Sequence, residues 1–192
     1  MNISRSTEPT ERGPAEEIAR FEANHSIGSA SPRALYDYAD ALRRVGRRSE
    51  ALSIYELLSN KPVPESKSWL VFLFLGETLS EAGRYAEAEA AFRTAVDLKP
   101  GTTVTWVYLA GALANQEKFE DAIQVLHNGL AVPGDHDEVL LNLALNLRTL
   151  GRLEDAAERL ERALKLNPDY DEAREVLEDV RKACAIRKCG NQ

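Results

Sequence analysis

A pattern that recurs roughly every 34 residues constrains this chain more than any other feature of its sequence. The segment 109–135 repeats the segment 75–101, and the segment 143–169 repeats it again after the same interval. A shorter copy, 38–58, precedes them after a slightly longer interval. A period of this length is typical of a stack of small structural units, each of which buries its apolar face against its neighbours.

Composition favours helices as the building material of these units. Alanine, leucine, glutamate and arginine are abundant, and all four are good helix formers. The chain has only 11 glycines and 8 prolines. Its β-branched residues do not cluster into alternating segments, which strands would require. Apolar residues make up 44% of the 192 residues, enough for a packed core. We therefore expect an all-α protein.

Small and large residues recur at fixed places in the four copies. A small residue allows two helices to cross closely, and a large apolar residue fills the layer between units. The small residue of the first helix, the alanine of the second helix and the large residue four positions later are, in order, Ala39, Gly76, Ala110 and Ala144; Ala51, Ala88, Ala122 and Ala156; and Tyr55, Phe92, Leu126 and Leu160.

The residues that end helices also recur at fixed places. Gly46, Gly83 and Gly151 stand at the turn between paired helices, where a left-handed residue is needed, but Glu117 takes this place in the third copy. Pro100 and Pro168 close their copies because proline cannot continue a helix, and Pro133 comes one position early. An aromatic residue in the first helix, Phe72 or Trp106, is matched by Leu35 and Leu140 in the outer copies.

These units resemble the tetratricopeptide repeat, a helix–turn–helix of about 34 residues, and the resemblance covers about residues 32–168. It implies a right-handed α-solenoid of four such units, here called repeats one to four. We expect a disordered tail over 1–13, a short N-terminal helix and linker over 14–31, and a capping helix and tail over 169–192. The eight repeat helices are expected at 32–45, 48–58, 66–82, 85–97, 103–116, 119–131, 137–150 and 153–166.

In this family the first helices line a concave groove, at the second, fifth, sixth, ninth, twelfth and thirteenth positions of each unit. In repeats two to four these positions are unusually apolar. Because large exposed apolar patches mark interaction sites, we predict partner binding there. An alternative is that the curvature of the stack or the N-terminal helix covers these residues. The predicted partner-binding residues are Leu70, Leu73, Phe74, Val104, Val107, Tyr108, Leu141, Asn142 and Leu145.

The short N-terminal segment "AEEIARFEANH" is also open to two interpretations. Ile18 and Phe21 fall on one side of the predicted helix. The helix can pack on the first repeat as a cap, or it can bind elsewhere and occupy the groove.

Charge and motifs exclude several classes of function. Lys and Arg number 24 against 31 Asp and Glu, a net charge of −7, whereas nucleic-acid binding needs a basic surface. The longest apolar run, 69–75, is too short to cross a bilayer, and residues 1–30 contain no signal-like apolar stretch, so we expect a cytoplasmic protein. No catalytic motif is visible, and we expect neither an enzyme nor a cofactor.

Metal binding is not expected either. Cys184 and Cys189 lie five residues apart, which is not a zinc-ligand spacing. The run 135–138, Asp-His-Asp-Glu, comes where a helix begins, and acidic residues there satisfy free N–H groups and the helix dipole.

The sequence therefore predicts a non-catalytic protein-interaction module, namely an adaptor, a scaffold or a small chaperone that binds an apolar peptide or helix in its groove. The alternative is an acidic immunity or inhibitor protein that binds a basic partner. Self-association into a homo-oligomer is a further option. Binding of chaperone C-terminal tails is not expected, because the positions of the family's carboxylate clamp hold Tyr36, Asp40, Phe74, Val104 and Tyr108.

Overall fold

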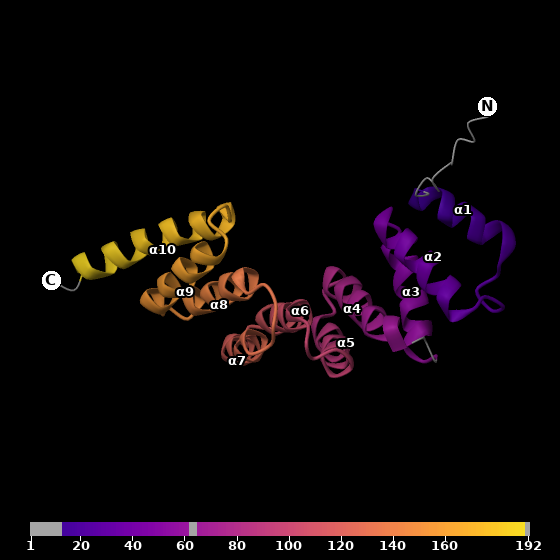
Figure 1. Ribbon diagram of the computed structural model, residues 1–192, viewed down its shortest axis with the longest axis horizontal. Helices are drawn as coiled ribbons and strands as arrows, with labels where there is room; N and C mark the ends of the chain where they lie inside the picture. The colour runs from indigo at the N-terminus through magenta and orange to yellow at the C-terminus, as the bar shows by residue number, and fades with distance from the viewer. Residues whose placement is uncertain (1–12, 62–64, 191–192) are drawn as a thin grey trace, which may run out of the picture. The chain divides into compact units, whose positions relative to one another are not determined.

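The computed structural model describes residues 13–61 and 65–190, with side chains for 13–61 and 67–187, and within these residues every regular element is an α-helix (Figure 1). The all-α prediction is confirmed. Helix ends agree with the expected ones to within two residues. The helices are α1 Pro14–Asn24, α2 Pro32–Arg44, α3 Arg48–Ser59, α4 Glu65–Glu81, α5 Tyr85–Leu98, α6 Thr103–Ala114, α7 Phe119–Leu130, α8 Asp137–Thr149, α9 Leu153–Leu166 and α10 Asp171–Gly190.

The predicted tail 1–13 lies outside the described residues except for Gly13, which precedes the first turn of α1. The chain divides into two compact units, residues 1–67 and 68–192, which we call the N-terminal body and the C-terminal body. The division falls in the first turn of α4. Repeat one, α2 and α3, belongs to the N-terminal body.

The N-terminal body is built from α1, α2 and α3. The Phe21 ring of α1 stacks on the Tyr38 ring of α2 at a centroid distance of 4.0 Å, and Ile18 of the same helix is also buried. Ser31 begins α2 by accepting a hydrogen bond from the Ala34 amide at 3.2 Å, which satisfies one of the free N–H groups of the first turn. The N-terminal helix thus packs against the first helix of repeat one.

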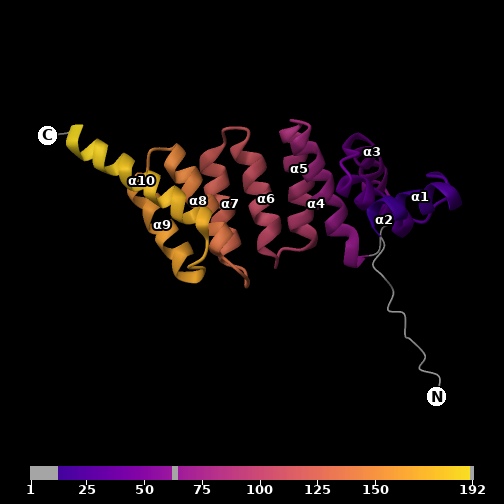
Figure 2. The same cartoon turned by 90° about the horizontal axis from the view of Figure 1, so that it is seen from above.

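The C-terminal body contains repeats two to four, whose helices α4 to α9 lie side by side in chain order (Figure 2). Each helix from α5 to α9 contacts the next one along the chain, and the first helices α6 and α8 also touch each other. The last helix, α10, packs against α9 and buries Ala173, Leu177 and Val180. No helix in the described part of the chain is long and apolar enough to cross a membrane.

The turns between paired helices share one backbone geometry. Gly46, Gly83 and Gly151 have φ angles of 82°, 75° and 71°, in the left-handed region. Glu117 has a φ of 61° at the same place in repeat three. In each turn the next amide donates to a carbonyl five residues back, as Arg84 does to Leu79 and Lys118 to Leu113. This is the hydrogen bond that ends a helix with a left-handed residue.

The crossing of α4 and α5 depends on a missing side chain. A β-carbon built on Gly76 would lie 2.5 Å from the ring of Phe92. Phe92 itself is fully buried. The ring therefore occupies the volume that the alanines of the other repeats fill with a methyl group.

Candidate protein-interaction face

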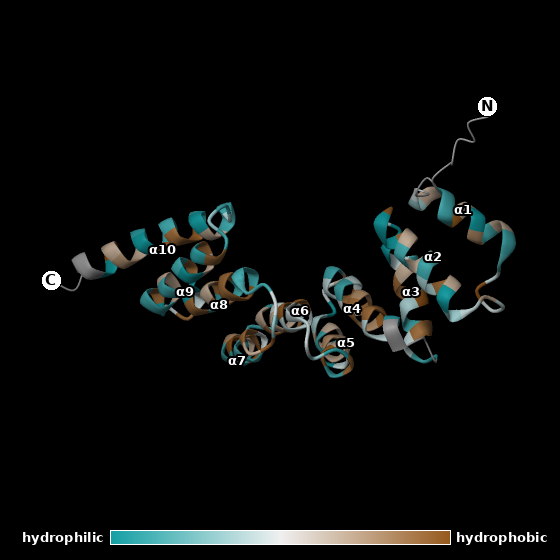
Figure 3. Cartoon of the chain, viewed as in Figure 1, coloured by the Kyte–Doolittle hydropathy of each residue, from teal (hydrophilic) through white to brown (hydrophobic). Residues whose placement is uncertain are grey.

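The nine predicted partner-binding residues all lie in the C-terminal body, on the first helices of repeats two to four. We call the surface that they share the first-helix face. Figure 3 shows hydrophobic residues along much of α4 and α6, the two helices that contribute six of the nine. By helix the residues are Leu70, Leu73 and Phe74 on α4, Val104, Val107 and Tyr108 on α6, and Leu141, Asn142 and Leu145 on α8.

Three of the nine are buried within the chain itself. Leu73, Val107 and Leu141 are only 5%, 8% and 2% exposed, and all three stand at the fifth position of their repeat. The first helices α6 and α8 contact each other, and the fifth position is buried in all three repeats. The surface open to a partner is therefore narrower than the sequence pattern indicates. It consists of the six half-buried residues, Leu70, Phe74, Val104, Tyr108, Asn142 and Leu145.

Tyr108 is a half-exposed aromatic residue whose ring contacts a buried core residue. Its ring lies 5.4 Å from that of Phe92, at an interplanar angle of 33°. Because Phe92 is buried, this contact restricts the orientation of the Tyr108 ring. An aromatic side chain ordered before binding loses little conformational entropy when a partner covers it.

Asn142 lies on α8, at the edge of the face that carries carboxyl groups. Its amide nitrogen donates to the Glu138 carbonyl at 2.9 Å, within α8. Burial raises the pKa of Glu138, and the neighbouring carboxylates of Asp137 and Glu172 raise it further. Three carboxyl groups therefore lie near one another at this edge of the face.

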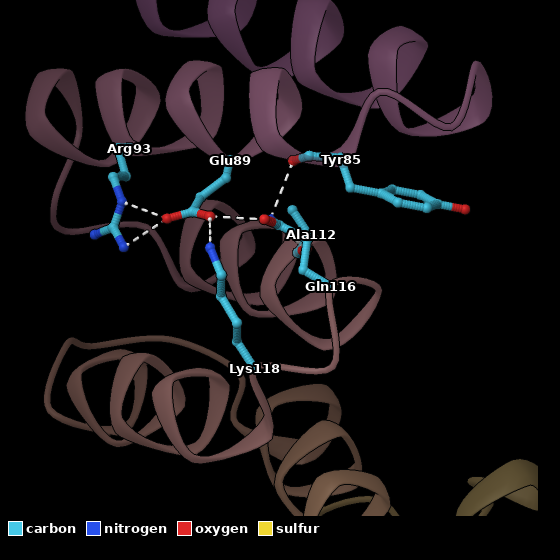
Figure 4. Close-up of polar contacts among 6 residues, drawn as sticks. All are labelled: Tyr85, Glu89, Arg93, Ala112, Gln116 and Lys118. Atoms are coloured by element: carbon cyan, nitrogen blue, oxygen red, sulfur yellow. Dashed lines mark hydrogen bonds and ion pairs between the residues drawn. The ribbon is translucent and has the colours of Figure 1, made fainter.

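A polar cluster connects the second helix of repeat two to the turn of repeat three (Figure 4). Glu89 of α5 accepts hydrogen bonds from Gln116 at 2.9 Å and Lys118 at 3.0 Å, and from Arg93 on its own helix. Gln116 also donates to the Tyr85 carbonyl. Burial alone would raise the pKa of Glu89, but the hydrogen bonds from Lys118, Arg93 and Gln116 outweigh it and lower the pKa to about 2.

Sequence reasoning missed this cluster because its members are ordinary surface residue types. The one signal was the departure of Glu117 from the turn glycine, which lies between Gln116 and Lys118. The cluster ties the strained turn to the preceding repeat, and so it positions α6, which carries Tyr108.

The residues considered for metal binding are engaged otherwise. Asp137 accepts hydrogen bonds from Asn167 and from the Glu138 amide, and the His136 ring nitrogen Nε2 lies 2.7 Å from the Val132 carbonyl oxygen. Within residues 13–61 and 67–187, no three His, Cys, Asp or Glu side chains are grouped so that they could hold a metal ion. Cys184 is a half-buried free thiol, and the side chain of Cys189 lies outside the described residues.

Comparison with known proteins identifies the repeats. Tetratricopeptide-repeat family models match residues 36–102, 79–144 and 137–170, which together span repeats one to four. The chain is a tetratricopeptide repeat protein. The resemblance inferred from its small residues, turn glycines and prolines is confirmed.

Curated relatives of two kinds are similar in sequence to part of this tetratricopeptide repeat protein. The peroxisomal targeting signal receptor of Kluyveromyces lactis is 32% identical over 97 residues, which are 50% of this chain and 17% of the receptor. The CTR9 homolog of Arabidopsis thaliana is 27% identical over 146 residues, 73% of this chain and 13% of that protein. The chain thus spans less than a fifth of the length of these relatives.

Solved structures share the fold over most of the chain. YrrB, a repeat protein described as having an unusual peptide-binding site, has a TM-score of 0.69 at 19% identity, over 86% of this chain and 81% of its own. A MamA structure has a TM-score of 0.71 at 17% identity, over 81% of this chain and 90% of MamA. The first tetratricopeptide domain of Spaghetti, bound to the HSP90 peptide SRMEEVD, has 0.58 at 26% identity, over 64% and 97%.

Proposed function

We propose that this tetratricopeptide repeat protein is a non-catalytic adaptor, scaffold or small chaperone whose first-helix face binds an apolar segment of a partner protein. The observation that carries the proposal is Tyr108, a half-exposed ring ordered by contact with the buried Phe92. Aromatic anchors of this kind provide most of the energy at protein interfaces. The peptide complex of the Spaghetti domain, a structural relative, supports a peptide as the partner.

The half-buried residues suggest how such a segment is held. Leu70, Phe74 and Val104 offer apolar area beside Tyr108, and Leu145 extends it onto α8. Asn142 donates one hydrogen bond within its helix, and an amide group can both donate to and accept from a peptide backbone. Apolar contacts would supply the affinity and this amide would set the register of the bound segment. We place this function in the cytoplasm.

An HSP90-type carboxylate tail is not the ligand that we propose. A carboxylate needs cationic or amide donors, which form charge-assisted hydrogen bonds. The corresponding positions here hold Asp40, Phe74, Val104 and the two tyrosines Tyr36 and Tyr108. Burial raises the pKa of Tyr36 to about 12, with further contributions from Asp40 and Asp37, so its hydroxyl stays neutral.

The second candidate function is an acidic inhibitor of a basic protein. It is favoured by the net charge of −7 and by the carboxylates around Glu138 at the edge of the face. A partner that binds by charge would dissociate as salt is raised, whereas binding through the apolar residues would persist.

Partner capture from a lysate, followed by affinity measurement with the purified partner, tests the proposal. The double variant Phe74→Ala/Tyr108→Ala is expected to weaken the affinity at least about thirtyfold, because loss of a central anchor costs about 2 kcal/mol or more. Tyr85→Ala removes a half-buried tyrosine from a second helix and serves as the matched control. Unchanged affinity in the double variant, with circular dichroism intact, would contradict the proposal. Sedimentation velocity on the same variants shows whether the partner is a second copy of the chain.

A further inference from the structure

A separate hollow of about 290 Å³ lies among α7, α8 and α9. None of its lining residues belongs to the first-helix face. Leucines form its apolar part, and two cations and a histidine form the rest. The lining residues are Leu130, His136, Leu140, Arg162, Lys165 and Leu166.

The internal repeat explains why space is left here. Leu140 stands one repeat period after Trp106, at the same position of the next repeat. Trp106 fills that position with an indole, whose Nε1 donates to the Pro100 carbonyl at 2.9 Å, and its β-carbon packs closely against Gly129. Leucine is much smaller than tryptophan. The hollow therefore lies over the residue of repeat four at which an aromatic side chain of repeat three has been replaced by an aliphatic one.

The hollow also has an exposed apolar side. Leu166 is 60% exposed, whereas Leu140, which also lines the hollow, is buried. Leu130 is half-buried. An apolar concavity with an exposed leucine on its edge gains free energy when an apolar group of a ligand covers it.

Two cations at the hollow have no partner within the described residues 13–61 and 67–187. Arg162 and Lys165 are exposed and make no ion pair or hydrogen bond there. Glu161 on the same helix, by contrast, is paired with Arg181 at 2.9 Å. The carboxylate of Asp137, which follows His136 in the chain, already accepts from Asn167 and the Glu138 amide. The hollow is thus locally cationic in a chain whose net charge is −7.

We propose that this hollow is a second binding site, which takes an aromatic side chain from a partner protein segment whose neighbouring residues are acidic. The aromatic ring would occupy the space that Trp106 fills in repeat three, on the apolar surface of Leu130, Leu140 and Leu166. Carboxylates beside the ring would pair with Arg162 and Lys165, and these cations also interact favourably with an aromatic face. The site is independent of the first-helix face.

Fluorescence anisotropy on the full chain tests this with three labelled peptides. The probe is fluorescein-Asp-Glu-Trp-Asp-Glu. One matched peptide replaces Trp by Ser, and the other replaces the acids by Asn and Gln. The probe is expected to bind at least about tenfold more tightly than either, since each loses one of the two recognised features, and to weaken as salt is raised. No binding of the probe up to about 1 mM protein, the weak limit of specific peptide recognition, would overturn the proposal.

Two variants locate the binding at the hollow. Leu140→Trp restores the residue type of repeat three and fills the space, so it is expected to lower the affinity for the probe at least about tenfold. Arg162→Glu/Lys165→Glu is expected to lower it at least as much, while the single change Lys182→Glu on α10 leaves it nearly unchanged. Unchanged affinity in both hollow variants would overturn the proposal. If Leu140→Trp does not fold by circular dichroism, the charge variant decides alone.

The variant Phe74→Ala/Tyr108→Ala separates this site from the proposed function. It is expected to bind the probe as the unmodified chain does. Loss of probe binding in that variant would assign the peptide to the first-helix face and overturn the assignment to the hollow.

Discussion

The α4–α5 and α6–α7 pairs occupy neighbouring repeats, one period apart, and solve the same packing problem with different side chains. Where α4 meets α5, Gly76 leaves room for the ring of Phe92. Where α6 meets α7, Ala110 and Leu126 stand at the matching positions and are both buried. The comparison shows that the repeat keeps the path of the backbone, while volume is exchanged between the two residues at the crossing.

The turns of the two pairs also differ, in the residue at the left-handed position. Gly83 takes a left-handed conformation without strain, but Glu117 takes it with a side chain that disfavours it. The residues on either side of Glu117 bind Glu89 of the preceding repeat. Polar contacts between repeats thus offset the unfavourable backbone conformation of the α6–α7 turn. The α4–α5 turn avoids this conformational cost because it has a glycine.

Gly76→Ala should have the largest effect. It gives the α4–α5 crossing the alanine found at the α6–α7 crossing, although the α4–α5 crossing also contains the larger Phe92. The added methyl group would overlap the Phe92 ring at an overpacking cost of about 3 kcal/mol. The gain in helix propensity offsets about 1 kcal/mol of this, so we expect a net loss of about 2 kcal/mol in the free energy of unfolding. Urea melts measure this loss. Adding Phe92→Leu recreates the Ala110–Leu126 pair and should recover part of it in a double-mutant cycle. Additive losses would show that the two positions are not coupled.

Glu89→Gln should have an intermediate effect, confined to the polar cluster of the α6–α7 turn. We expect a loss of about 1–2 kcal/mol at pH 7, since one partly buried carboxylate accepts several charge-assisted hydrogen bonds. The pKa of Glu89 is lowered to about 2 in the folded state, from an ordinary value of 4.5. The stabilisation is therefore complete above pH 4.5 and fades as the pH falls toward 2.

Urea melts of both proteins between pH 7 and pH 2 test this dependence. The exposed Glu87, paired with Arg84 on the surface, supplies the control variant Glu87→Gln, with a smaller loss expected. A difference between the Glu89→Gln variant and the unmodified chain that stays constant down to pH 2 would contradict the assignment to the carboxylate.

Glu117→Gly should have the smallest effect and the opposite sign. It gives the α6–α7 turn the residue of the α4–α5 turn, and we expect a gain of about 0.5–1 kcal/mol, since the left-handed strain exceeds the entropy that glycine adds to the unfolded chain. Thermal melts measure the gain. Glu120→Gly, within α7, should instead destabilise by about 1 kcal/mol. A loss on Glu117→Gly would show that this side chain makes a contribution of its own.

Much of the fold could be predicted because its determinants are local. Turn glycines, closing prolines and small residues recur at fixed spacing, and each acts at the helix end or the helix crossing where it lies. Glu117 broke the glycine pattern in the sequence, yet the backbone adopts the left-handed geometry there too, since the helices on both sides determine the turn.

The candidate site was less predictable because burial depends on neighbours that are distant in sequence. Leu73, Val107 and Leu141 share the apolar character of Leu70 and Phe74, and only their burial in the folded chain separates them from the more open residues. The hollow above Leu140 likewise required three helices to be placed. In the sequence, the change from Trp106 to Leu140 is one apolar residue replacing another.

The placement of the tryptophans has a consequence for how unfolding of this chain is observed. The chain contains two, and both Trp69 and Trp106 belong to the C-terminal body. The sequence of the N-terminal body contains tyrosines but no tryptophan, and among these tyrosines are the stacked Tyr38 and the buried Tyr55. Indole emission therefore reports on residues 68–192 alone, whereas helical ellipticity sums over both bodies. Melting curves recorded by the two signals coincide only if the bodies unfold together.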